Sequence, residues 1–230
     1  MGQILAESGK GVGRAMAEGG PDFYARLHRI GDYLRGVDSE ILPTKFGKMQ
    51  GEGVEYAKLE GIADNLETLK NADTDIQGLN SLVKNIASGS SKENFLNYAH
   101  EATVAATLQK GGRVVTKVGQ NVKTKIGATE IDIELKSGDT IEVKHGDLTK
   151  ADKDQLKTQL AYRRENSLSG NHYVQVEGEI SDEMESFLNK ENIRKLSAPT
   201  DNQASLSQGL ATGLSVKETG NTHSATPSYV

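Results

Sequence analysis

Two short stretches of alternating apolar and polar residues, 130–135 and 141–144, constrain the fold of this chain most strongly. Successive side chains of a β-strand point to opposite faces, so each stretch would have one apolar and one polar face. The apolar residues of the pair are Ile131, Ile133, Leu135, Ile141 and Val143. They share one buried face only if paired positions sum to an even number, which a three-residue loop at 136–138 provides. Such a loop needs a left-handed residue at its last position, where Gly138 stands.

This register predicts the composition of the polar face of the hairpin. Asp132 would lie opposite Glu142, and Lys144 would lie opposite Glu130. Like charges directly opposite each other destabilise a sheet, and a divalent cation between Asp132 and Glu142 would reverse that effect. Mg²⁺ and Mn²⁺ bind through a few carboxylate oxygens and keep water or phosphate as their other ligands. Lys144 would then orient an attacking water or stabilise charge that develops on a phosphate.

Further elements are expected on both sides of this hairpin. Apolar residues at helical spacing predict helices over residues 22–34, 54–69, 75–86, 91–110, 152–165 and 181–196. Apolar and β-branched residues predict further strands over 113–118 and 172–177. From residue 91 onward the expected order is α-β-β-β-α-β-α, which is an α/β fold.

Composition divides the 230 residues into four expected segments. Residues 1–87 would form a helical N-terminal region, available to a protein partner or to a second copy of the chain. Residues 88–92 include Ser88-Gly-Ser-Ser91 and are typical of a linker. Residues 93–197 would form the α/β domain. Residues 198–230 are polar and aperiodic, so we expect a disordered tail.

The motif residues and their spacing resemble the PD-(D/E)xK nuclease superfamily, which includes restriction enzymes, RecB-type nucleases and Holliday-junction resolvases. Asp132 matches the first acidic motif residue, and Glu142-Val-Lys144 matches the second motif. Glu101, in His100-Glu101-Ala102, stands where many members carry a helical glutamate. Ile131 replaces the usual proline, and Gln159 and Tyr162 are three positions apart where RecB-type members have a spacing of four. The resemblance covers about residues 93–177.

The resemblance implies a restriction-endonuclease-like core and a Mg²⁺-dependent or Mn²⁺-dependent nuclease, with DNA favoured over RNA as substrate. It implies that Asp132, Glu142 and Glu101 bind the metal, and that these residues and Lys144 carry out catalysis. Polar and basic residues that follow the motif are candidates for phosphate contacts. They are Lys150, Lys153, Lys157, Gln159 and Arg163.

Three alternatives remain open at this stage. In the first, the hairpin is an ordinary one with a solvated polar face, on which Glu130 and Lys144 form a surface ion pair that contributes under about 1 kcal/mol. A nuclease fold without activity would serve as a nucleic-acid-binding module in a phage or DNA-processing assembly. The α/β domain would be the nuclease toxin of a contact-dependent system if residues 1–90 served for entry.

Composition excludes several other classes. The chain has no Cys, which rules out disulfides, thiolate metal sites and cysteine nucleophiles. Its net charge is −5, so the whole chain is not a polybasic nucleic-acid binder, although residues 113–164 carry 11 basic and 8 acidic residues. No apolar run approaches the length of a membrane span, and the N-terminus has no secretory pattern. We therefore expect a cytoplasmic protein without membrane contact.

Overall fold

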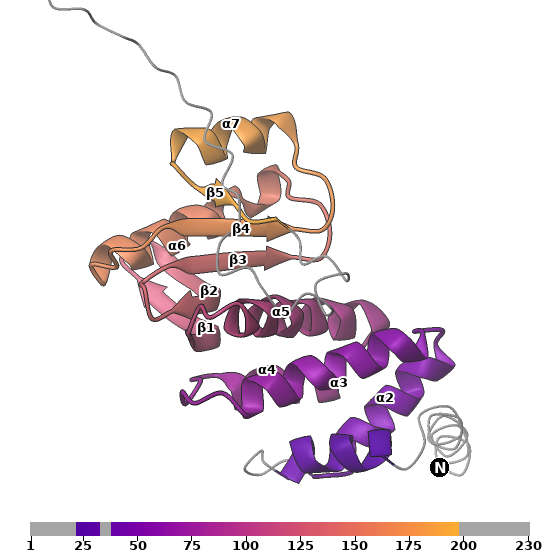
Figure 1. Cartoon of the computed structure of the whole chain (residues 1–230). Helices are drawn as coiled ribbons and strands as arrows, with labels where there is room; N and C mark the ends of the chain where they lie inside the picture. The colour runs from indigo at the N-terminus through magenta and orange to yellow at the C-terminus, as the bar shows by residue number, and fades with distance from the viewer. Residues whose placement is uncertain (1–21, 33–37, 198–230) are drawn as a thin grey trace, which may run out of the picture. The chain divides into compact units, whose positions relative to one another are not determined.

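A five-stranded mixed sheet organises the part of the chain that the structure, a computed structural model, describes: residues 22–32 and 38–197 (Figure 1). The strands, in their order across the sheet, are β1 (Val115–Thr124), β2 (Gly127–Leu135), β3 (Thr140–Lys144), β4 (His172–Val176) and β5 (Arg194–Lys195). β2 is antiparallel to both of its neighbours, β1 and β3, and β4 and β5 continue the sheet parallel to β3. The predicted α/β class is confirmed at this level.

Helices precede and connect the strands. Residues 22–32 are helical, and the elements that follow are α2 (Ile41–Gly51), α3 (Tyr56–Lys70), α4 (Leu79–Ser88), α5 (Lys92–Lys110), the 3₁₀ turn η1 (Lys150–Asp152), α6 (Lys153–Glu165) and α7 (Asp182–Lys190). The sequence analysis did not predict α2, which contains Pro43. Pro43 lies in the first turn, where the missing N–H costs no intrahelical hydrogen bond. No helix in these described ranges has the length and apolar character needed to cross a membrane.

The predicted hairpin register is confirmed. Ile133 pairs with Ile141 and Glu134 pairs with Thr140, which is the even-sum pairing. The Leu135 N–H donates to the Asp139 carbonyl oxygen at 2.9 Å, so the loop is residues 136–138. Gly138 has φ +83°, a left-handed conformation that residues with a side chain rarely adopt.

α5 packs between the sheet and the N-terminal helices (Figure 1). One cluster of buried apolar side chains contains residues of the N-terminal helices such as Leu27 and Phe46, residues of α5 such as Ala102, and Ile133 and Ile141 of the sheet. In the expected linker, the Gly89 carbonyl oxygen accepts a hydrogen bond from Lys45 Nζ at 2.6 Å. The separate domains at 1–87 and 93–197 remain a prediction. Because the two segments share this core, whether each of them folds independently has to be tested.

The opposite face of the sheet is covered by α6 and α7. Leu156 of α6, Val174 of β4 and Phe187 of α7 belong to a second cluster of buried apolar residues. The expected helix over 181–196 is shorter than predicted, because Asn192 adopts a left-handed conformation with φ +55°. The chain then turns into β5 beside β4. The expected disordered tail, residues 198–230, lies outside the described residues.

Candidate metal centre

Asp132 and Glu142 meet where the pairing between β2 and β3 ends. The ladder between the two strands consists of the pairs at Ile133 and Glu134 and extends no further along β3. Beyond it, Asp132 Oδ2 accepts the backbone N–H of Val143 at 2.7 Å, so a carboxylate occupies the place of a ladder carbonyl. A hydrogen bond also joins the carboxyl groups of Asp132 and Glu142. The sequence-based pairing of these two residues is therefore present as side-chain contact.

Glu101 reaches the same place from α5. Its carboxylate accepts a hydrogen bond from the backbone N–H of Gly119, while its Oε1 is buried without a partner. Gly119 has φ +55°, and a Cβ atom there would lie 3.5 Å from Glu101 Oε1 and 3.3 Å from Glu130 Oε1. Gly119 thus leaves room for two carboxylates to approach each other. The sequence analysis missed this residue, because a glycine within a strand can equally mark a bulge, a bend or a close approach of another group.

Burial and mutual repulsion govern the protonation of this acidic cluster, which we define as Glu101, Glu130, Asp132 and Glu142. Burial raises the pKa of Glu101 well above its usual value, and the charges of Glu130 and Glu142 raise it further. Burial likewise raises the pKa of Asp132, with added repulsion from Glu142 and Glu101. For Glu142, burial raises the pKa to about 7 although hydrogen bonds from its neighbours favour the ionised form. Burial also raises the pKa of Glu130.

No Lys or Arg within residues 22–32 and 38–197 forms an ion pair with any carboxylate of the acidic cluster. Buried charges are normally paired or bound to a metal. The donors are all carboxylate oxygens, which suit hard cations such as Mg²⁺ and Mn²⁺, and Glu101 Oε1 lacks a partner. The residues present therefore fit a divalent cation. No three of these carboxylates offer oxygens that all lie within 4.8 Å of one another, so they would have to move closer around the ion.

Lys144 is near this cluster but has a different partner from the one predicted. The register placed it opposite Glu130, whereas its Nζ donates to Asp152 Oδ1 at 2.5 Å. The Lys144 charge nevertheless lowers the pKa of Glu142, which places the ammonium within electrostatic reach of the cluster. The sequence analysis missed Asp152. A signal for it existed, because Thr149-x-x-Asp152 is a capping box that precedes a helix.

The polar face of the hairpin is buried beneath α6. Gln155 Nε2 donates to Glu142 Oε1 at 2.9 Å, and Gln159 Nε2 donates to Glu142 Oε2. Gln159 also donates to the backbone oxygen of Glu130 at 2.9 Å. Because Glu142 is only 4% exposed, the alternative of a solvated polar face is wrong.

The five residues considered for phosphate contacts separate into two groups. Lys150 and Lys153 lie 3.6 and 3.5 Å from Glu183 Oε1, and Lys157 Nζ lies 2.8 Å from Asp154 Oδ1, all at the protein surface. Gln159, in contrast, is buried against Glu142.

Arg163, the fifth of these residues, is also buried. Its guanidinium donates to the Gly138 carbonyl oxygen at 2.9 Å, to Thr140 Oγ1 at 2.8 Å and to the Gly170 carbonyl oxygen. These bonds tie two loops together and leave Arg163 unavailable to a nucleic acid in this arrangement. The surface candidates are therefore the three lysines.

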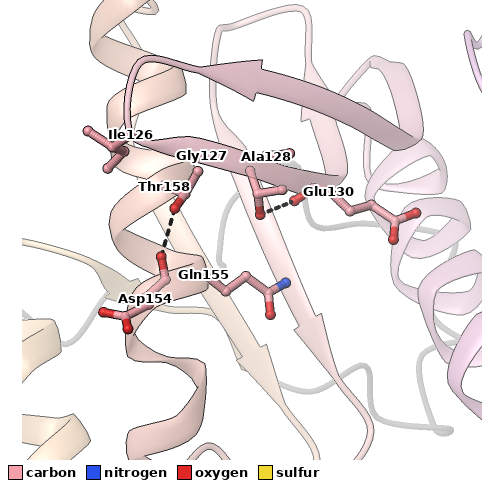
Figure 2. A pocket seen from close by; sticks show the side chains of 8 residues that line it. Ile126, Gly127, Ala128, Glu130, Asp154, Gln155 and Thr158 are labelled. Atoms are coloured by element: carbon pink, nitrogen blue, oxygen red, sulfur yellow. Dashed lines mark hydrogen bonds between the residues drawn. The ribbon is translucent and has the colours of Figure 1, made fainter.

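A groove lies between the start of β2 and α6, and Glu130 of the acidic cluster is one of the residues that line it (Figure 2). It has a volume of about 480 Å³ and is lined by Ile126, Gly127, Ala128, Thr129, Glu130, Asp154, Gln155 and Thr158. Figure 2 shows the turn between β1 and β2, with Ile126, at one end and Glu130 at the other. Glu130 belongs to the acidic cluster and Gln155 donates to Glu142, so the groove ends beside the cluster.

No family model matches this chain, and no curated protein or solved structure shows significant similarity to it. The geometry and electrostatics of the acidic cluster are therefore the basis for the function proposed below.

Proposed function

We propose that this protein is a metal-dependent nuclease that hydrolyses phosphodiester bonds, with DNA favoured over RNA. One observation carries the proposal: three buried carboxylates, from α5, β2 and β3, come near one another without a neutralising side chain in the part of the chain that the structure describes. Such an arrangement is costly unless a cation completes it. The groove beside Glu130 and Gln155 would give a phosphate access to the cation.

The order of elements supports the resemblance to the PD-(D/E)xK superfamily, and we propose a restriction-endonuclease-like core on this basis. Helix α5 precedes an antiparallel β1-β2-β3 meander, and α6 connects β3 to the parallel strand β4. Asp132 lies on β2, and Glu142 and Lys144 lie on β3. Glu101 lies on the helix, as in many members of that superfamily.

In the proposed mechanism, Asp132, Glu142 and Glu101 would hold one or two Mg²⁺ or Mn²⁺ ions. When bound, the metal would polarise the scissile phosphate and lower the pKa of a water ligand. Gln155 and Gln159 hold both oxygens of Glu142 and thereby fix the orientation of that carboxylate. Asp152 holds Lys144, whose ammonium would position the attacking water or stabilise charge on the phosphate.

The decisive experiment compares the purified full chain on duplex DNA, single-stranded DNA, branched DNA and tRNA. We expect cleavage with Mg²⁺ or Mn²⁺, no cleavage with excess chelator, and no cleavage by Glu142→Gln. Glu134→Gln is the matched control, since it alters a buried glutamate on the same face of the sheet. Hydrolysis that persists in excess chelator would refute the mechanism. Metal-dependent binding without cleavage would favour the silent nucleic-acid-binding module.

A further inference from the structure

A second group of potential metal ligands lies at the ends of β3 and β4, on the face of the sheet that α5 covers. It consists of His100 on α5, His145 directly after β3 and Glu177 directly after β4. One ligand atom from each of the three residues lies within 4.8 Å of the other two. His145 Nδ1 contacts Glu177 Oε2, and His100 Nδ1 lies 3.9 Å from the same oxygen. We call these residues the histidine cluster.

The hydrogen bond of His100 to the sheet determines which ring nitrogen faces the cluster. His100 Nε2 lies 2.6 Å from Oε1 of Gln175, a fully buried side chain on β4. An amide oxygen only accepts, so Nε2 carries a proton, and in the neutral imidazole Nδ1 then carries the lone pair. Metal-binding histidines commonly have this arrangement, in which one ring N–H donates to the protein while the other nitrogen is left for the metal.

Without a cation, the Nδ1 lone pair of a neutral His100 faces the carboxylate of Glu177, so two acceptors oppose each other at 3.9 Å. The imidazole rings of His100 and His145 have centroids 5.6 Å apart, which brings the second ring to the same space. A cation between the three groups would give both acceptors a partner. The Glu177 side chain is 45% exposed, so a water molecule has access to complete the coordination.

We propose that His100, His145 and Glu177 form a Zn²⁺ site that is distinct from the acidic cluster. Two imidazoles and one carboxylate are a ligand set that zinc accepts in tetrahedral geometry with a water as fourth ligand. Mg²⁺ prefers oxygen ligands, so nitrogen donors here and oxygen donors at the acidic cluster would separate the two metals. The site would join α5, β3 and β4, and its ligand His100 directly precedes Glu101 on α5. The proposal does not depend on nuclease activity.

The competing interpretation is a hydrogen-bonded His–Glu pair without metal. The chain offers a matched example in His28 and Glu40, whose Nε2 and Oε1 lie 3.6 Å apart. This pair does not belong to a three-ligand group among the described residues. His28→Ala is therefore the control for loss of a histidine beside a glutamate.

The test uses the full chain, stripped of metal by a chelator, and titrates it with ZnCl₂ in a calorimeter. We expect saturable binding near one Zn²⁺ per chain that an excess of Mg²⁺ does not displace. His145→Ala and Glu177→Gln should each weaken binding at least about tenfold, since even outer partners of metal ligands contribute about 10–100-fold. His28→Ala should bind as the unaltered chain does. Co²⁺ in place of Zn²⁺ should give a visible absorption band that Glu142→Gln retains.

Two results would overturn the proposal. The first is a folded, unaltered chain that shows no saturable Zn²⁺ binding. The second is a Glu177→Gln protein that binds Zn²⁺ with unaltered affinity. Glu177 is partly exposed and its replacement is isosteric, so this variant should fold even if a histidine variant does not. A Co²⁺ band lost in Glu142→Gln but kept in Glu177→Gln would assign the metal to the acidic cluster instead.

Discussion

Glu134 and Asp132 lie two residues apart on β2, on the same face of the sheet and under the same covering helix, yet their surroundings differ. Glu134 accepts from Lys117 Nζ at 2.8 Å and from the Tyr162 hydroxyl at 3.0 Å. Asp132 has the Val143 N–H and the carboxyl group of Glu142, and no cationic side chain among the described residues. The fold thus neutralises Glu134 with its own side chains, whereas Asp132 has no such partner among the described residues, which is where we propose an external cation.

On the basis of this difference, we expect Glu134 to have a structural role and Asp132 to have a functional one. A buried ion pair such as Lys117–Glu134 is a common structural feature, and its loss affects stability first. Buried carboxylates that raise one another's pKa are concentrated at functional sites. The following five predictions test whether the two ends of this face behave so differently, beginning with the largest expected effect.

Asp132→Ala should abolish cleavage and metal binding together. The substitution removes one of the three proposed ligands, and the remaining carboxylates cannot hold the cation in the same geometry. Mn²⁺ titration calorimetry and single-turnover rates on the preferred substrate measure the two losses. Cleavage at the unaltered rate would show that both ends of the face are structural.

Lys144→Ala should lower the single-turnover rate by about 10²–10³, the typical effect of one electrostatic group. Mn²⁺ affinity should change little, because Lys144 bonds to Asp152 and not to the proposed ligands. Lys144→Arg should restore little, because a planar guanidinium does not replace a compact ammonium. Lys117→Ala is the control at the other end of the face and should cost stability without a matching loss of rate.

The metal-free protein should lose stability as the pH rises from about 4.5 to about 7. Glu142 has a folded-state pKa raised from 4.5 to about 7, so folding favours the protonated carboxyl. This contribution is fully present below pH 4.5 and is lost as the pH rises through the folded pKa. At about 1.4 kcal/mol per pKa unit, the loss is on the order of 3 kcal/mol. Urea unfolding at several pH values would measure it.

Two comparisons test the origin of that pH dependence. Glu142→Gln should reduce the slope of the profile in this window, because the amide does not titrate, while Glu101 and Asp132 keep their raised pKa values. Mg²⁺ or Mn²⁺ should restore stability at pH 7 by binding the folded state. A profile that stays the same in Glu142→Gln would contradict the raised pKa.

Glu134→Gln should destabilise the protein by about 1–3 kcal/mol, since it leaves Lys117 without its carboxylate partner in a partly buried place. Cleavage by the folded variant should remain close to that of the unaltered chain. Urea unfolding and single-turnover rates are the two measurements. A loss of rate as large as that of Glu142→Gln would show that the proposed division between the two glutamates is incorrect.

Tyr162→Phe should have the smallest effect, a loss of about 0.5–1.5 kcal/mol in the free energy of unfolding. It removes the hydroxyl that donates to Glu134 Oε2 and leaves the Lys117 ion pair in place. Thermal unfolding detects a change of this size. A large effect on Mn²⁺ affinity would mean that the two ends of the face are coupled through α6.

The sequence predicted the local part of this site well. The register of the hairpin, and with it the meeting of Asp132 and Glu142, followed from the alternation of apolar residues and a loop of fixed length. Gly138 followed from the same argument. These features depend on residues close together in the chain, so simple geometry constrains them.

The long-range part could not be predicted in the same way. The hairpin register placed Lys144 opposite Glu130. Only the path of the chain into α6 brings Asp152 Oδ1 to 2.5 Å from Lys144 Nζ. The role of Gly119 becomes clear only from the structure, because a Cβ atom there would lie 3.5 Å from Glu101 Oε1. The histidine cluster brings together residues 100, 145 and 177, and no spacing motif relates positions so far apart.

The packing of α5 on both sides has a consequence for how such a protein could be rearranged. The helix carries Glu101 near the sheet, while Ala99, Ala102 and Ala105 belong to the core that it shares with the N-terminal helices. Small side chains allow close approach, and a close-packed core tolerates few changes of volume. Any segment that replaced the N-terminal helices would therefore also have to support the helix that carries Glu101.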